Sequence, residues 1–364
     1  MKIKDILKDL ESWAPPAYQE SYDNSGLLVG DKNEVLQGVL ISLDVTMEVL
    51  EEALDKKCNL IIAHHPLIFR GLKRLTPGHW VNDCLLKAIK NDIAIYAIHT
   101  NLDNITGGVN WKISNKIGLE NLEVLSPKSA TLQKLVTFIP KKDAQAVLDA
   151  VHEAGAGQIG NYDTSSFQQD GLGRFRPNEM ANPTIGKKGK VETVEETKIE
   201  VLAPAHLSNR IISALKKAHP YEEVAYFLQP IDNLNQDVGS GAVGELPSEV
   251  PFDSFIEALK ASMNLEVVKS TKPSKPTVKR VAVCGGSGSF LLSAAKRAGA
   301  DIFITADFKY HEFFEAEDQI TILDIGHYES EVFTKDLIAN RLRENFANIA
   351  LHLSQVVTNP IKYL

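Results

Sequence analysis

The sequence predicts an α/β protein in which two related halves of one split domain are interrupted by a ferredoxin-like α+β insert. Short apolar segments of strand length alternate with amphipathic helical segments near both ends of the chain. That pattern changes in the middle, and 364 residues exceed what one hydrophobic core usually supports. We therefore predict a first half over residues 1–125, an insert over 126–235 and a second half over 236–364.

Composition excludes several classes of protein. The formal net charge of −8 makes general affinity for nucleic acid unlikely. The three cysteines are isolated and have no zinc-motif spacing, which indicates a reducing compartment. The first ten residues form an amphipathic helical pattern rather than a signal peptide, and no apolar run is long enough for a membrane span. We expect a cytoplasmic protein.

Strands and helices alternate regularly in the first half. The segment Leu60–Ala63 is apolar throughout, as in a strand buried on both faces of a parallel sheet. Further strands are predicted at 38–44 and 93–98, and helices at 46–56 and 81–90. Thr46 is the expected cap of the first of these helices. The order strand, helix, strand, helix, strand predicts a parallel sheet covered by helices.

The predicted insert contains two β-α-β units joined by a polar, glycine-rich segment. Its strands are predicted at 134–140, 161–167, 198–202 and 224–228, and its helices at 143–154 and 207–218. The charged stretch 187–198 is expected on the surface.

The second half returns to the pattern of the first. Strands are predicted at 280–284, 301–305 and 320–323, and helices at 252–263, 291–298 and 310–316, with a last long helix that starts near residues 324–327. The segments Leu40–Ala63 and Val281–Ala306 both read as strand, turn, helix and strand of similar length. This likeness predicts that the two halves are related.

Two adjacent histidines follow the buried strand of the first half. Pro66 cannot donate to a sheet ladder, so the strand should end at His64 and His65, at the carboxyl edge where open α/β sheets bind ligands. Neighbouring side chains on a strand point to opposite faces, so each histidine would hold one of two adjacent ions. The alternative is a pair of structural histidines under a loop.

Three further side chains are candidate ligands. His327 and Glu331 are four residues apart on a predicted helix and therefore project from one face. Asp103 follows another predicted strand, although it could equally serve in a turn or a helix cap. An exposed His–Glu pair is the alternative for the first two. We expect these residues and the two adjacent histidines at loops on one edge of the sheet, where they would suit Zn²⁺, Mn²⁺ or Fe²⁺.

Two other motifs give weaker signals. The segment 284–289, Cys-Gly-Gly-Ser-Gly-Ser, lies between a strand and a helix, as a phosphate-binding turn would, but it lacks the dinucleotide and Walker spacings. A tight turn is the alternative role. The segment 219–223, His-Pro-Tyr-Glu-Glu, is interpreted as a structural turn.

Three motifs together resemble those of the GTP cyclohydrolase 1 type 2 homologue family, also described as Ngg1-interacting-factor-3-like. They are His-His-Pro at 64–66, His-Thr-Asn-Leu-Asp at 99–103 and Gly-His-Tyr-Glu-Ser-Glu at 326–331. The resemblance covers the whole chain and extends to the lesser motifs at 22–27 and 284–288. It implies a dinuclear metal site, a ring-shaped homohexamer and a PII- or CutA-like insert that meets its copies as trimers.

Carried over residue by residue, the family's ligands fall on His64, His65, Asp103, His327 and Glu331. The resulting hypothesis is a metal-dependent hydrolase of a nucleotide or phosphorylated small molecule, with two divalent ions per chain, Zn²⁺ first. We expect His64 and His327 to hold one ion and His65 and Asp103 the other, with Glu331 between them.

The sequence does not identify the general acid or base. Asp307, His311 and His99 are the candidates, and no spacing argument selects among them. One rival function is a metal-binding regulatory or scaffold protein with an effector-binding insert and no turnover. Another is metal storage or chaperoning.

Overall fold

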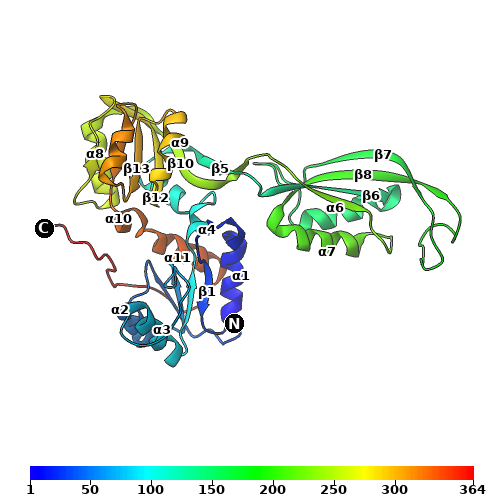
Figure 1. Cartoon of the computed structure of the whole chain (residues 1–364), viewed down its shortest axis with the longest axis horizontal. Helices are drawn as coiled ribbons and strands as arrows, with labels where there is room; N and C mark the ends of the chain where they lie inside the picture. The colour runs from blue at the N-terminus through cyan, green and yellow to red at the C-terminus, as the bar shows by residue number, and fades with distance from the viewer. The chain divides into compact units, whose positions relative to one another are not determined.

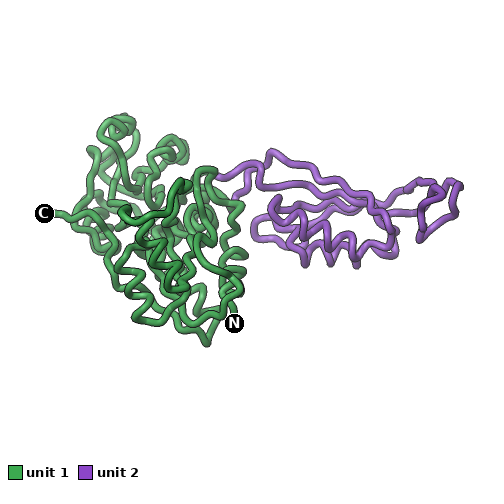
Figure 2. The backbone as a smooth tube through the Cα atoms, turned by 60° about the horizontal axis from the view of Figure 1, so that its bottom comes forward, with its two compact units in different colours: residues 1–126, 238–364 green, residues 127–237 purple.

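The computed structural model describes all residues, 1–364, and has a mixed α/β fold with three sheets. The chain forms two compact units, shown in Figure 2. Unit 1 comprises Met1–Ser126 and Val238–Leu364, and unit 2 comprises Pro127–Asp237. None of the helices has the length and apolar character needed to cross a membrane.

The first sheet of unit 1 contains the strand that precedes the two histidines. Its order is β1-β4-β3-β2-β15, with β2, β3, β4 and β15 parallel and β1 antiparallel to β4. The strands are β1 (Gly26–Val29), β2 (Val39–Ser42), β3 (Leu60–Ala63), β4 (Ala94–Ala97) and β15 (Leu351–Leu353). The three central strands are completely buried, which confirms the prediction of a parallel core.

The helices of this part of the chain include the two that the periodicity predicts between the parallel strands. They are α1 (Ile3–Trp13), α2 (Met47–Asp55), α3 (Trp80–Lys90), α4 (Thr100–Asp103) and α5 (Val109–Lys116), with a 3-10 turn at Pro16–Tyr18. The Thr46 hydroxyl accepts a hydrogen bond from the Val49 amide, so the expected cap of α2 is present.

The second sheet of unit 1 has the order β11-β14-β13-β12-β10-β5. Its strands are β5 (Glu120–Lys128), β10 (Asn235–Pro251), β11 (Lys269–Ser270), β12 (Thr277–Ser287), β13 (Ile302–Ala306) and β14 (Thr321–Asp324). The helices of this region are α8 (Phe252–Met263), α9 (Leu292–Arg297), α10 (His327–Glu331) and α11 (Thr334–Asn345), with 3-10 turns at Ser289–Leu291 and Tyr310–Ala316. Strands β12, β13 and β14 are parallel.

Two features of this region differ from the sequence prediction. The last long helix is broken into α10 and α11, and Phe333 between them packs beneath the Lys116 ammonium group. No glycine or proline marks this break. Strand β10 was not predicted because its glycines interrupt the apolar alternation. Gly244 is required there, since a Cβ would lie 2.8 Å from the Glu120 carbonyl oxygen.

Unit 2 is a four-stranded antiparallel sheet with two helices on one face, as Figure 1 shows. Its order is β7-β8-β6-β9, built from β6 (Leu132–Pro140), β7 (Ser166–Phe175), β8 (Glu192–Pro204) and β9 (Tyr226–Pro230). The helices are α6 (Ala144–Glu153) and α7 (Ser208–Ala218), and 3-10 turns occur at Lys141–Asp143 and Ala205–Leu207. Alternate residues of the sheet, such as Leu135, Ile199 and Val201, form a core with both helices.

One prediction for unit 2 is wrong, and another holds for most but not all of its residues. The strand expected at 161–167 lies mainly further along the chain, as β7. The stretch 187–198 is not simply surface, because β8 begins at Glu192 and both Glu196 and Thr197 are buried. Its residues from Glu192 onward form a long antiparallel pair with β7, which composition alone does not reveal.

Candidate metal centre

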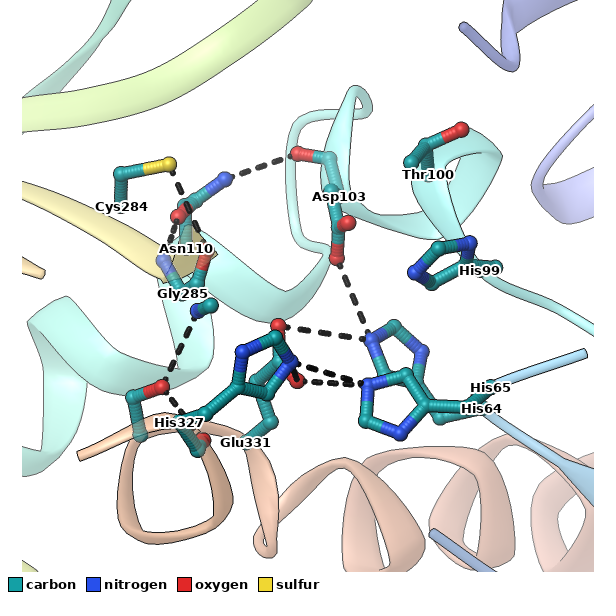
Figure 3. Close-up of polar contacts among 12 residues, drawn as sticks. His64, His65, His99, Thr100, Asp103, Asn110, Cys284, Gly285, His327 and Glu331 are labelled. Atoms are coloured by element: carbon teal, nitrogen blue, oxygen red, sulfur yellow. Dashed lines mark hydrogen bonds and ion pairs between the residues drawn. The ribbon is translucent and has the colours of Figure 1, made fainter. Parts of the chain in front are cut away.

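The candidate ligands lie at the carboxyl ends of strands from two different sheets of unit 1. His64 and His65 follow β3, and Asp103 lies at the end of α4, which follows β4. His327 and Glu331 are the first and last residues of α10, which follows β14 of the second sheet. The expectation of a single sheet edge is therefore wrong. Side chains that follow parallel strands of two separate sheets meet at this centre, as Figure 3 shows.

One cluster consists of His65, His327 and Glu331. The Nε2 atoms of the two histidines are 3.3 Å apart, and Glu331 Oε2 lies 2.8 Å from Nε2 of His65 and 3.1 Å from Nε2 of His327. The i,i+4 spacing on α10 directs both of its side chains to the same point, as expected. Three ligand atoms that converge in this way can hold one metal ion.

A second cluster shares the same glutamate. His64 Nε2 lies 3.6 Å from Asp103 Oδ1 and 3.8 Å from the other carboxylate oxygen of Glu331, Oε1. The expected pairing of His64 with His327, and of His65 with Asp103, therefore differs from the structure. His64 faces the loop after β4, whereas His65 faces α10, because adjacent residues point in different directions.

Every imidazole of this region has an oxygen acceptor at its Nδ1 atom. The four Nδ1–acceptor distances are 2.8 Å for His64 to the Ile98 carbonyl, 2.7 Å for His65 to Asp44, 2.7 Å for His99 to Asp23, and 2.7 Å for His327 to Asp307. A carbonyl oxygen can only accept, so Nδ1 of His64 carries its proton. In a neutral imidazole, an acceptor at this position keeps the proton on Nδ1 and makes the Nε2 lone pair available to a metal ion.

Two buried atoms of the second cluster have no hydrogen-bond partner. They are His64 Nε2 and Asp103 Oδ1, which face each other across the 3.6 Å separation. A buried polar atom without a partner costs about 1–3 kcal/mol. A cation between this lone pair and this carboxylate would remove that cost. The residues present therefore fit a divalent metal ion.

Neighbouring carboxylates raise the pKa of two imidazoles of this centre. Burial lowers the pKa of His65, but its hydrogen bonds to Asp44 and Glu331 outweigh burial and raise that pKa to about 10. Burial also lowers the pKa of His327, but Glu331 and Asp307 outweigh burial and raise that pKa to about 9. Burial raises the pKa of Asp103 to about 6. The imidazoles are thus poised to exchange a proton for a metal ion.

Gly286 makes room for the shared glutamate. A Cβ on Gly286 would lie 2.5 Å from Glu331 Oε1, and the residue has a φ of +61°, which favours glycine. The amides of Gly285, Gly286 and Gly288 already donate to Asn110, Ser330 and Thr305 side chains respectively. Those three amides are therefore occupied, and this segment is a packing turn rather than a phosphate cradle.

Sequence reasoning did not assign Asp44 and Asp23 as acids that orient the histidines. Asp44 lies two residues after β2 as His65 lies two residues after β3, so its position at a strand end was a usable signal. Asp23 lies in the turn before β1, and its carboxylate accepts hydrogen bonds from the backbone amides of Asn24 and Thr100 as well as from His99. These bonds outweigh burial and hold the pKa of Asp23 well below its usual range. Only the fold brings Asp23 to His99, 76 residues away.

The centre opens into a cavity of about 360 Å³, called here the metal-centre cavity. Tyr22, Phe69 and Phe290 line it together with His65, His99 and other polar residues. No lysine or arginine lines it. An anionic ligand in this cavity would therefore meet positive charge only from metal ions and protonated imidazoles.

The comparisons with known proteins agree with this fold. A 36% identical protein of Halalkalibacterium halodurans and a 35% identical one of Bacillus subtilis each bear the name GTP cyclohydrolase 1 type 2 homolog. The first match covers 100% of both chains, and the second covers 99% of this chain and 98% of the relative. A crystal structure of a Bacillus cereus protein related to NIF3 is 38% identical with a TM-score of 0.88, covering 100% of this chain and 99% of that chain.

A Staphylococcus aureus protein of known structure is also similar. It is 32% identical, has a TM-score of 0.79, and the match covers 100% of this chain and 99% of that one. The family model described as Duf34/NIF3 (NGG1p interacting factor 3) matches residues 1–360. The chain therefore belongs to the Duf34/NIF3 family.

Proposed function

We propose that the protein is a metal-dependent hydrolase with two divalent ions per chain, of which Zn²⁺ is the first candidate and Mn²⁺ or Fe²⁺ the others. His64 and Asp103 would hold one ion, His65 and His327 the other, and Glu331 would contribute one carboxylate oxygen to each. The observation that carries the proposal is the pair of buried, unpartnered atoms, His64 Nε2 and Asp103 Oδ1, beside a carboxylate shared with a second cluster.

The proposed substrates are nucleotides or phosphorylated small molecules. Two adjacent divalent ions supply Lewis acidity toward water and toward phosphoryl oxygens. The metal-centre cavity offers no lysine or arginine to such a substrate, so its affinity should depend on the loaded metal. The printed name of the relatives, GTP cyclohydrolase 1 type 2 homolog, is consistent with a nucleotide substrate.

Among the proposed acid–base residues, the geometry favours His99. Its ring lines the metal-centre cavity, and Asp23 accepts a hydrogen bond of 2.7 Å from its Nδ1 atom. This bond orients the ring so that Nε2 faces His64 and His65. Asp307 instead orients His327, and His311 is exposed beside Tyr310, away from the lining of this cavity. His99 would therefore move the proton during hydrolysis.

We also propose that unit 1 consists of two related halves, that unit 2 is a ferredoxin-like insert, and that the chains assemble into a homohexamer. The order β-α-β-β-α-β of unit 2, with its four-stranded antiparallel sheet, supports a ferredoxin-like insert of the PII or CutA type. Strand, helix, strand repeats in both sheets of unit 1 support two related halves. The ring-shaped homohexamer built from trimers is part of this proposal, and native mass spectrometry would test it.

Activity of the metal-loaded protein on a panel of nucleotides and phosphoesters tests the function. The wild type should turn over at least one class of compound. His99→Asn should retain two ions per chain while losing about two to four orders of magnitude in kcat, the range for a general acid–base residue. Glu331→Gln should lose both metal and turnover.

A matched control is Glu315→Gln, which removes an exposed acid outside the centre. It should change neither metal content nor turnover. Metal-replete wild-type protein without turnover on the whole panel would contradict the hydrolase and favour the regulatory or scaffold function. Unchanged metal content in Glu331→Gln would remove the proposed site itself.

A further inference from the structure

Unit 2 contains a cavity of its own, with a volume of about 640 Å³, called here the unit 2 cavity. Phe138, Glu196 and Lys198 line it, and they lie on the sheet face opposite to the one that α6 and α7 cover. The segment 176–185 and residues 221–225 form further parts of its wall. Its volume falls within the range of small-molecule sites, about 300–1,000 Å³.

A buried carboxylate belongs to this cavity. Glu196 is only 9% exposed, and its Oε1 accepts a hydrogen bond of 2.9 Å from the Tyr221 hydroxyl. A Cβ on Gly173 would lie 1.9 Å from Glu196 Oε2, so glycine on the neighbouring strand leaves room for the carboxylate. A carboxylate held in this way can accept hydrogen bonds from N–H donors of a ligand.

Two aromatic rings stand beside the carboxylate. The rings of Phe175 and Tyr221 contact each other edge to face, with centroids 5.9 Å apart. The Tyr221 amide donates to Nδ1 of His219, whose Nε2 donates to the Phe138 carbonyl at 3.0 Å. The His-Pro-Tyr-Glu-Glu segment is thus a structural turn that also fixes the Tyr221 ring. Fixed aromatic faces suit a planar heterocycle.

Two unpaired arginines line the cavity, whose wall also carries the carboxylates of Asp170, Glu222 and Glu223. Arg174 and Arg176 line it, are exposed, and form no hydrogen bond or ion pair through their guanidinium groups. Lys198, by contrast, is paired with Glu200 at 2.5 Å. Unpaired guanidinium groups are well suited to bidentate recognition of phosphate.

We propose that the unit 2 cavity binds a purine nucleotide. The base lies against Phe175 and Tyr221 and donates N–H hydrogen bonds to Glu196, while the phosphate binds Arg174 and Arg176. This site is separate from the metal centre, and nucleotide binding here requires no metal ion.

Calorimetric titration of the full-length, chelator-treated protein with guanosine 5′-monophosphate tests the proposal. We expect one site per chain, at least tenfold weaker binding in the double variant Arg174→Ala/Arg176→Ala, and unchanged binding in Glu331→Gln. Lys187→Ala/Lys190→Ala removes the same charge outside the cavity lining and should bind like the wild type. Guanosine and inorganic phosphate alone should each bind at least tenfold more weakly than the nucleotide.

Hydrogen–deuterium exchange locates the site in the same samples. The nucleotide should protect amides in β7 and in the segment 176–185. Absence of binding at millimolar nucleotide, equal affinity of the arginine variant, or protection confined to peptides around His64, His99 and His327 would each overturn the proposal. Glu196→Gln provides a second variant, expected to weaken the nucleotide but not phosphate alone.

Discussion

The metal centre of unit 1 and the cavity of unit 2 differ in the burial of their charged groups and in the presence of arginine. In the metal centre, Glu331 is 3% exposed in its side chain and His64 is fully buried, and no lysine or arginine lines the adjoining cavity. In the unit 2 cavity, Arg174 and Arg176 are exposed and unpaired. The first arrangement lacks a cation, whereas the second presents two unpaired guanidinium groups beside the carboxylates of Glu196, Glu222 and Glu223.

This difference supports the proposal that the two regions bind different ligands. Burial of imidazole lone pairs and of carboxylates without counter-charges costs free energy, and bound metal ions or bound protons would offset that cost in the metal centre. Solvated guanidinium groups carry little free-energy cost when no ligand is bound to them. Ligand binding should therefore depend on metal ions in the metal centre and not in the unit 2 cavity.

The largest expected effect is that of Glu331→Gln. Glu331 contributes an oxygen to both clusters, and loss of one partner of a buried charged group costs about 3–5 kcal/mol, or two or more orders of magnitude in affinity. Elemental analysis after dialysis should show loss of both ions. Nucleotide binding by the unit 2 cavity should persist. Retention of both ions by the variant would contradict a shared glutamate.

Metal affinity should rise steeply with pH, whereas the unit 2 cavity should show no such rise. In the metal-free protein the raised pKa values, about 10 for His65 and about 9 for His327, mean that both rings are protonated at pH 7. Metal binding requires neutral rings, so it must displace those protons, and this cost falls as pH increases toward 9.

Each displaced proton gives about a tenfold gain in apparent affinity per pH unit. Calorimetry in buffers of different ionisation enthalpy would count the protons released. Asp44→Asn removes a carboxylate that raises the pKa of His65, so it should lower that count. An affinity that stays constant between pH 7 and pH 9 would contradict this account.

A smaller effect is expected when an orienting acid is changed. Asp307→Asn keeps the size of the side chain but weakens the acceptor for Nδ1 of His327, and loss of such partners typically costs 10–100-fold in metal affinity. Competition with a metal-sensitive dye measures the loss. Only the ion held by His65 and His327 should weaken. Equal weakening of both ions, or of neither, would show that the two clusters are not distinct.

The smallest effects compare two glycines that make room for a carboxylate. Gly286→Ala places a Cβ against Glu331 at a positive φ and should lower the free energy of unfolding by more than about 1 kcal/mol. Gly173 has no positive φ, so Gly173→Ala should destabilise less while weakening nucleotide binding through Glu196. Chemical denaturation and calorimetry distinguish these outcomes. A larger loss of stability in Gly173→Ala than in Gly286→Ala would contradict the comparison.

The positions of the candidate ligands along the chain were predictable. The apolar strand Leu60–Ala63, the proline after two histidines, and the i,i+4 spacing of His327 and Glu331 each have a local physical meaning. The mixed α/β fold and the buried parallel strands followed from alternation of apolar segments. These features depend on residues close together in the sequence.

The partnerships among those ligands were not predictable. Whether His64 meets Asp103 or His327 depends on how two sheets approach each other, and no local pattern records that approach. The same holds for Asp23 and His99. The first residues of β8, before the strand predicted at 198–202, were missed because their pairing with β7, rather than their composition, makes them part of a strand.

Anomalous diffraction at the zinc absorption edge, on crystals of the zinc-loaded protein, tests the central claim most directly. The account predicts two peaks per chain, one between His64, Asp103 and Glu331 and the other between His65, His327 and Glu331. A single peak, or peaks bound by other side chains while these five stay free of metal, would contradict it.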